Sequence, residues 1–379
     1  MTLILLGAIF TILSLFSPAD TLATWTKYEN NPVLEGTEGK WDNASVANQK
    51  VLYINGVYKM WYSGHNGNIW QIGYATSPDG LIWEKYTQPI ITPNSAENWE
   101  NRTVKEVTHP SVLFTPPNKY EMWYCVISST WQTGEDRFRV KYASSNDGIN
   151  WNIYPGYVLI GTPNKWDRGG IGRGFSIIKV DNTYKMWYSG VNEQNKWGIG
   201  FATSKDGINW NKYPSNEEPQ EIITPNNLWE KSWLSYPYVL YNGQIYYMFY
   251  VSASSGTGEN IVYAISTDGI NWEKPNNGIN PIITVGDHGS FDSHDIVTPS
   301  VIKEDGIFKM WYSGFNGNKW RIGFASGELP SSYPTPAPLP PLVFLPGLGG
   351  SWNFESLFLG IEKPPSECCL LYTSDAADE

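Results

Sequence analysis

Two similar segments of the chain place an acidic residue four positions before a proline. Glu106 begins the segment E-V-T-H-P, and Asp295 begins D-I-V-T-P. Cleavage of a glycosidic bond needs one carboxylic acid that protonates the leaving oxygen and one carboxylate that acts as nucleophile or activates water. Glu106 and Asp295 are therefore the candidate catalytic pair. The competing interpretation is a pair of ordinary solvated carboxylates.

Three further segments align with these two when all five are matched at the proline position. The row of the two acids then reads Ser45, Glu106, Ile171, Trp233 and Asp295. The row directly before the proline position reads Asn48, His109, Gly174, Tyr236 and Thr298. A reaction on an asymmetric substrate needs positions at which repeated segments differ. These rows and the residues beside them therefore supply the candidate substrate-binding residues Trp233, Arg173, His109, Tyr236 and Asn48.

Each of these side chains has a chemistry that suits a sugar ligand. Trp233 could stack on a sugar ring, Arg173 could bind a hydroxyl or a carboxylate, and His109 could bind substrate or lie near a metal ion. For each, the alternative is an ordinary hydrogen-bonded or solvated group. The sequence itself requires no cofactor, and a calcium ion bound in a central channel is left open.

Internal repetition predicts the elements that must position these residues. Apart from the initiator, the methionines are spaced 62, 64, 62 and 62 residues apart, and each is followed by Trp-Tyr or Phe-Tyr. They are Met60, Met122, Met186, Met248 and Met310. Y-K-M-W-Y-S-G occurs twice and F-K-M-W-Y-S-G once, and a second motif, D-G-x-x-W, follows about 20 residues after four of the five methionines.

The repeat predicts an all-β fold, specifically a five-bladed β-propeller with four strands per blade over residues 25–327. The last repeat stops at Gly327 without its D-G-x-x-W segment. The missing piece appears near the N-terminus, where W-T-K-Y from Trp25 matches W-E-K-Y from Trp83. We therefore expect the N-terminal strand to complete the last blade, so that no blade is left with an open edge.

Most of the 19 tryptophans belong to this repeat. They recur in the M-W-Y motif, after Asp-Gly, at the repeat starts and before the third strand. A residue present in nearly every blade serves a need that every blade has, which is packing against its neighbour. We therefore interpret the repeated tryptophans as scaffold, and the Asp of each Asp-Gly as a residue that shapes the turn.

The blade count, the blade length and the two motifs resemble the arabinanase, levansucrase and invertase superfamily, including glycoside hydrolase family 43. The resemblance implies hydrolysis of O-glycosyl bonds. It also implies a general base just before a proline in the first blade, where this chain has Asn48-Gln49. The general acid implied in a later blade falls at Arg173-Gly174-Phe175, and the acid that tunes it falls at His109. The family's usual acids therefore do not transfer to this chain.

The ends of the chain carry different signals. Residues 1–23 resemble a cleavable signal peptide, which predicts a secreted protein with no membrane association after cleavage. Residues 328–341 are a Pro-rich linker. Residues 342–379 are expected to be a truncated fragment of a second domain with an aberrant tail. P-L-V-F-L-P-G-L-G-G from Pro341 resembles the start of an α/β-hydrolase domain.

The formal charge of −11 argues against a nucleic-acid partner, because phosphate binding needs a basic face. We expect a monomer that acts on an oligo- or polysaccharide as a glycoside hydrolase. The alternative functions are a non-catalytic carbohydrate-binding propeller and a structural propeller attached to a second hydrolase domain.

Overall fold

The computed structural model divides the chain into two compact units, Met1–Ser331 and Ser332–Glu379, and every described residue belongs to the first. The predicted signal peptide, almost all of the predicted linker and the predicted C-terminal fragment lie outside the described residues. The structure describes residues 24–93, 98–99, 102–128, 137–225, 230, 233–254, 258–275 and 281–329.

The described residues form an all-β unit without an α-helix, which confirms the expected fold class. No helix in this part of the chain has the length and apolar character needed to cross a membrane. By their antiparallel pairings most strands fall into five groups, and a parallel pairing of Gly170 with Phe138 joins the second and third groups into one sheet. The first two groups are β2 (Ser45–Ile54), β3 (Val57–His65), β4 (Trp70–Ser77) and β5 (Glu84–Lys85), then β7 (Arg102–Thr115), β8 (Lys119–Ser128), β9 (Phe138–Ser145) and β10 (Asn152–Ile153).

The other three groups follow the same order along the chain. They are β11 (Gly170–Val180), β12 (Thr183–Val191), β13 (Trp197–Ser204) and β14 (Trp210–Lys212), then β16 (Trp233–Tyr241), β17 (Tyr246–Ser254) and β18 (Gly258–Ser266), then β19 (Asp295–Glu304), β20 (Ile307–Phe315), β21 (Trp320–Glu328) and β1 (Thr24–Lys27). Two short strands lie at the margins, β6 (Asn98–Trp99) against β7 and β15 (Glu221–Ile223) against β13.

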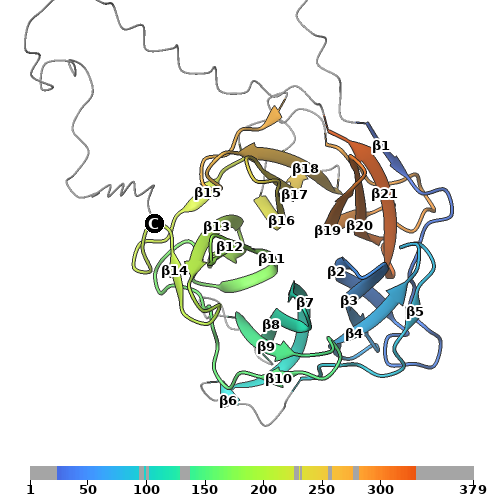
Figure 1. The fold of residues 1–379 in the computed structure, drawn as a ribbon, viewed down its shortest axis with the longest axis horizontal. Helices are drawn as coiled ribbons and strands as arrows, with labels where there is room; N and C mark the ends of the chain where they lie inside the picture. Colours follow the sequence, from blue (N-terminus) through green and yellow to red (C-terminus); the bar gives the residue numbers. More distant parts are fainter. Residues whose placement is uncertain are drawn as a thin grey trace, which may run out of the picture. The chain divides into compact units, whose positions relative to one another are not determined.

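The groups are arranged around a common centre, which we call the hub (Figure 1). The first strands β2, β7, β11, β16 and β19 contact one another in this order, and β19 contacts β2, so the contacts close a ring. The last group also takes in the N-terminal strand. β1 pairs antiparallel with β21, and Trp25 lies opposite Gly327, which is the pairing that the sequence predicted.

The two repeated motifs meet between neighbouring groups. The M-W-Y tryptophan of one group is fully buried, and its indole N–H donates to the carbonyl of the Asp-Gly glycine in the next. Trp311 in the last group reaches Gly80 in the first at 2.7 Å, so this contact also bridges the point where the ring closes. The same contact is made by Trp61 to Gly148, Trp123 to Gly207 and Trp187 to Gly269. The interpretation of these tryptophans as scaffold is therefore confirmed.

A buried ion pair recurs inside the groups. In the first, Asp42 accepts a hydrogen bond from the hydroxyl of Tyr62, and the ammonium of Lys85 lies 2.7 Å from its carboxylate. In the last group the N-terminal strand supplies the lysine, since Lys27 lies 2.7 Å from Asp292. The equivalent sets are Asp167 with Tyr188 and Lys212, and Glu230 with Tyr250 and Lys274. The acids at the group starts thus belong to the scaffold.

Candidate functional site

The hub-facing strand of every group carries a β-bulge at the position that the sequence alignment singled out. At each bulge a residue other than glycine has a positive φ, which costs energy and is seen most often where surrounding structure or function demands it. The five residues are Asn48 (56°), His109 (53°), Arg173 (46°), Tyr236 (54°) and Thr298 (52°). Four of the five predicted binding residues, all except Trp233, are therefore held in strained backbone conformations around the hub.

The first strand of the third group, β11, departs from the sequence alignment. Its bulge spans Ile171 to Phe175, one residue longer than the others, because Arg173 and Gly174 both adopt positive φ. The residue that matches Glu106 in the sheet register is consequently Gly170, and the placement of Ile171 in that row was wrong by one position. An extra residue inside a bulge leaves the flanking hydrophobic pattern unchanged, so the sequence carried no sign of it.

The serine of Y-S-G holds the bulge of the next group. The backbone N–H of His109 donates to Ser63 Oγ at 3.1 Å, and that of Tyr236 donates to Ser189 Oγ at 2.9 Å. Across the ring closure, Asn48 N–H donates to Ser313 Oγ at 2.9 Å. The repeated motif therefore contributes to the candidate site indirectly, by fixing the strained backbone that presents the non-repeated side chains.

A cavity of about 180 Å³ opens at the hub beside these bulges. Its lining includes Glu106, His109, Tyr236 and Asn48, together with two tryptophans, Trp70 and Trp320. We had counted these two tryptophans as scaffold. They are only partly buried, and each is the first residue of the third strand of its group.

His109 is the polar side chain in this cavity whose hydrogen-bonding capacity is unused. Neither ring nitrogen is exposed to solvent, and neither has a hydrogen-bond partner among the described residues. Burial, reinforced by the positive charge of Arg173, lowers the pKa of His109 to about 3. The imidazole is therefore neutral near pH 7, and it can donate one hydrogen bond and accept another. The ring of Tyr236 lies 5.7 Å away.

Asn48, by contrast, has its side chain committed to the protein. Its amide donates to Thr108 Oγ1 at 2.9 Å and accepts from Thr298 Oγ1 at 3.1 Å. A much smaller cavity of about 20 Å³ lies deeper in the hub and is lined by the residues around the five bulges. Asn48 thus joins three groups at the wall between the two cavities.

A second polar cluster surrounds Arg173. Its guanidinium lies 3.2 Å from Glu259 Oε1 and packs against the rings of Trp197 and Trp233. The indole N–H of Trp233 donates to the same oxygen of Glu259 at 3.3 Å. Burial raises the pKa of Glu259, and the nearby Asp295 carboxylate adds to this rise, which outweighs the lowering by the positive charge of Arg173. A carboxyl group that keeps its proton to higher pH is suited to acid catalysis.

The predicted pair Glu106 and Asp295 is not brought into the lining of one cavity. Glu106 lines the hub cavity, and its carboxylate lies 3.7 Å from the ammonium of Lys105. Asp295 is absent from that lining, and its carboxylate hydrogen-bonds to His294 Nδ1 at 2.7 Å. Burial raises the pKa of Tyr236, and the charges of Arg173, Glu259 and Asp295 also affect it. Since Tyr236 lines the hub cavity, the cluster around Arg173 lies within electrostatic range of that cavity.

Sequence reasoning missed Glu259, although the repeat contains a signal for it. The sheet registers align one residue at or next to the start of the third strand in each group, and four of these five residues are aromatic. The row reads Trp70, Phe138, Trp197, Glu259 and Trp320. Glu259 is the exception, in a segment without the tryptophan that marks the third strand in three other groups. An alignment of the third strands, as well as the first, would have identified it.

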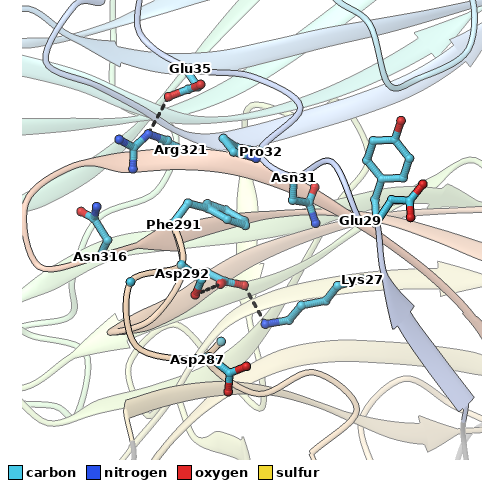
Figure 2. A pocket seen from close by; sticks show the side chains of 14 residues that line it. Lys27, Glu29, Asn31, Pro32, Glu35, Asp287, Phe291, Asp292, Asn316 and Arg321 are labelled. Carbon is cyan, nitrogen blue, oxygen red and sulfur yellow. Dashed lines mark hydrogen bonds and ion pairs between the residues drawn. The ribbon is translucent and has the colours of Figure 1, made fainter.

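The largest cavity among those described, about 590 Å³, lies away from the bulges, between the N-terminal segment and the last group (Figure 2). Its charged lining is largely committed to closing the ring. Lys27 pairs with Asp292, and Arg321 donates to Glu35 at 2.7 Å. The Asn31 side chain makes two hydrogen bonds to the backbone of Phe324. This cavity therefore lies along the junction at which the N-terminal segment closes the ring, and we place the candidate catalytic site at the hub instead.

Among the described residues, no three His, Cys, Asp or Glu side chains gather closely enough to hold a metal ion. The channel-bound calcium ion considered from the sequence stays a prediction.

No family model matches the chain. Uncharacterized protein Rv1502 of Mycobacterium tuberculosis is 30% identical over 237 residues, which cover 60% of this chain and 74% of that protein. The chain belongs to the same family as Rv1502. A more distant relative of this chain is the beta-1,2-mannobiose phosphorylase of Thermoanaerobacter sp., 26% identical over 37% of the chain and 48% of that enzyme. Another is the 1,2-beta-oligomannan phosphorylase of the same organism, 20% identical over 54% of the chain and 84% of that enzyme.

Solved structures show the same fold. A glycoside hydrolase covers 80% of this chain and 92% of its own with a TM-score of 0.63 at 18% identity. A structure described as belonging to the GH130 family of mannoside phosphorylases, which contains hydrolases of beta-1,2 mannosidic linkages, covers 81% and 95% with a TM-score of 0.63 at 16% identity. An N-acetylgalactosamine deacetylase from F. plautii also matches, with a TM-score of 0.57 at 18% identity, over 78% of this chain and 95% of its own. The fold alone therefore does not determine the reaction.

The named homologues and most of these neighbours are glycoside hydrolases and phosphorylases, several of which act on mannosides. They support the expectation of a carbohydrate-active, propeller-type protein. The more specific resemblance to family 43 remains a prediction.

Proposed function

We propose that the described unit is a five-bladed β-propeller whose blades are the five strand groups, with four strands per blade and the last blade completed by β1. The closed ring of contacts among the five first strands supports this arrangement. So does the recurrence of a lysine paired with a buried acid, because Lys27 of β1 takes the place in the last group that Lys85 takes in the first.

We further propose that this propeller cleaves glycosidic bonds of an oligo- or polysaccharide at the hub. The observation that carries the proposal is the cavity of about 180 Å³ that is lined by Glu106, His109 and two tryptophans, His109 having no hydrogen-bond partner among the described residues. This volume holds about six water molecules at ~30 Å³ each, which suits a single sugar residue better than a longer stretch of glycan. Aromatic faces can stack on the sugar ring, and neutral His109 can exchange hydrogen bonds with its hydroxyls.

Carboxyl chemistry supplies the reaction in this proposal. Glu106 faces the cavity and is the carboxylate that activates water or attacks the anomeric carbon. Asp295 is the partner predicted from the sequence, and its charge acts on both Glu259 and Tyr236. The names of the relatives make β-mannosides the first substrates to test, with water or phosphate as the acceptor.

The test is a screen of aryl glycosides and of β-1,2-linked mannobiose, each with and without inorganic phosphate, using the wild-type protein, Glu106→Gln and Glu217→Gln. Glu217 is exposed, so its substitution is a matched control. We expect turnover by the wild type and by Glu217→Gln, and a loss of about 10²–10⁴-fold in Glu106→Gln. Equal turnover by all three would remove Glu106 from the mechanism. Absence of turnover on every substrate would refute the enzymatic function.

A non-catalytic carbohydrate-binding propeller is the second candidate function. It is favoured by the residues that stand where the family 43 resemblance implies acids, namely Asn48, His109 and Arg173-Gly174. Calorimetric titration with the same oligosaccharides distinguishes the two functions. Binding without turnover would support this alternative. Secretion, the Pro-rich linker and a second hydrolase domain remain predictions from the sequence.

A further inference from the structure

Glu259 occupies a position at which the other four strand groups have an aromatic residue. Trp70 and Trp320, its counterparts in two of those groups, line the hub cavity. Trp233, Ala253 and Glu259 are aligned across the three strands of the fourth group, as Ser45, His65 and Trp70 are in the first. The carboxyl group therefore belongs to the same end of the hub as the cavity.

The contacts of Glu259 fix one carboxyl oxygen and leave the other available. Arg173 and Trp233 both donate to Oε1, at 3.2 and 3.3 Å. No described residue donates to Oε2. The side chain is only 14% exposed, so the carboxyl group is held in place with little freedom to turn. A fixed carboxyl group with one unengaged oxygen is suited to proton transfer to a bound ligand.

The groups around Glu259 determine whether it carries a proton. β11 contributes the positive charge of Arg173, and β19 contributes the negative charge of Asp295, which is itself hydrogen-bonded to His294. Burial and Asp295 raise the pKa of Glu259, and together they outweigh Arg173. Asp295 thus acts on the proton of Glu259 without having to reach the substrate.

We propose that Glu259 is the general acid of the glycosidic cleavage, that Asp295 is a positioning residue whose charge favours the protonated form of Glu259, and that Glu106 is the general base. This assignment rests on the proposed function and gives Glu259 the role that the sequence had suggested for Asp295. In the reaction, Glu259 Oε2 gives its proton to the glycosidic oxygen as the bond between that oxygen and the anomeric carbon breaks. A water molecule attacks the anomeric carbon and gives its proton to Glu106. Exchange with solvent then restores the starting protonation of both carboxyl groups.

The test compares two classes of substrate that differ only in the leaving group. A 2,4-dinitrophenyl glycoside needs no protonation to depart, whereas an alkyl glycoside does. In Glu259→Gln we expect kcat/KM on the alkyl glycoside to fall about 10²–10⁴-fold and on the dinitrophenyl glycoside less than about 10-fold. The alkaline limb of the wild-type pH profile should disappear on the alkyl substrate. Asp295→Asn should move that limb to lower pH, because removing a negative charge lowers the pKa of Glu259.

Glu217→Gln is the matched control and should match the wild type on both substrates. A Glu259→Gln protein that loses activity equally on the two substrates, with an unchanged pH profile, would overturn the assignment. A wild-type protein that is inactive on all glycosides would instead refute the proposed function and this assignment with it. In an active wild type, a Glu259 ¹³C carboxyl resonance that titrates at or below the ordinary value of about 4.3 would overturn the assignment alone.

Discussion

Replacing Lys27 tests how the N-terminal strand closes the ring. Among the described residues, Lys27 is the only charged partner of Asp292, whose side chain is 2% exposed. Lys27→Met keeps most of the aliphatic side chain and removes the charge. Asp292 would then keep the hydroxyls of Tyr312 and Ser290 as hydrogen-bond donors but would have no countercharge among the described residues.

The expected loss follows from the burial of the pair. Removing one partner of a buried ion pair costs about 3–5 kcal/mol, because the other charge is left uncompensated. Lys27 is 31% exposed, so water can partly replace it, and we expect the lower end, about 3 kcal/mol. Lys212 makes the same contact with Asp167 inside the third group but is only 5% exposed. Lys212→Met should therefore cost more, about 5 kcal/mol.

Equilibrium urea unfolding followed by tryptophan fluorescence measures these losses. Glu29→Gln is the control, because Glu29 is an exposed neighbour on the same N-terminal segment and its substitution should change the free energy of unfolding by less than about 0.5 kcal/mol. A Lys27→Met protein as stable as Glu29→Gln would refute the idea that this ion pair secures the ring closure. A Lys212→Met protein less affected than Lys27→Met would refute the ranking by burial.

Three further predictions concern the repeated motifs. Ser63→Ala should lower the free energy of unfolding by about 1–3 kcal/mol in urea, because the backbone N–H of His109 loses its acceptor, and an unchanged stability would show that the serine does not hold the bulge. Gly207→Ala should lower the free energy of unfolding by about 2–4 kcal/mol, because φ is +78° and a Cβ would lie 2.8 Å from a tryptophan ring carbon. Gly39 is the control, because its φ is +70° and its Cβ would meet open space, so Gly39→Ala should lower the free energy of unfolding by only about 1 kcal/mol. Equal losses in the two variants would contradict the packing argument. Burial raises the pKa of Asp268, but the hydrogen bonds of its turn outweigh burial and lower this pKa to about 2. The carboxylate therefore stabilises the fold above its usual pKa, and this contribution is lost as the pH falls towards 2. The stability difference between the wild type and Asp268→Asn, followed by acid titration, should therefore narrow between about pH 4 and pH 2, and a constant difference would count against this role.

The repeat made the scaffold predictable from the sequence. Packing between neighbouring groups imposes the same requirement each time, and the same residues meet it, so the M-W-Y and D-G-x-x-W motifs could be read as structure. The match between Trp25 and Trp83 predicted the pairing of β1 with β21 for the same reason. Alignment on the proline position also located four of the five strained residues of the hub.

The candidate site was less predictable because it depends on differences among the repeats. The extra residue in the bulge at Arg173 shifts the register of β11 by one position without changing the hydrophobic pattern of that strand. Glu259 lies near the start of the third strand of its group, whereas the proline that aligns the repeats marks only the first strands. The protonation of Glu259 depends on Arg173 and Asp295, which come from two other groups and which only the folded arrangement brings near it.

The closure of the ring by β1 also has a consequence for folding. A ribosome makes the N-terminal strand first, and its partner β21 is among the last strands of the unit to appear. Lys27 and Asp292 are 265 residues apart in the chain, so their contact is strongly non-local. The entropy of closing so long a loop must be overcome before the contact contributes any stability. Until then β1 remains an unpaired edge, and the last group combines the oldest and the newest residues of the nascent unit.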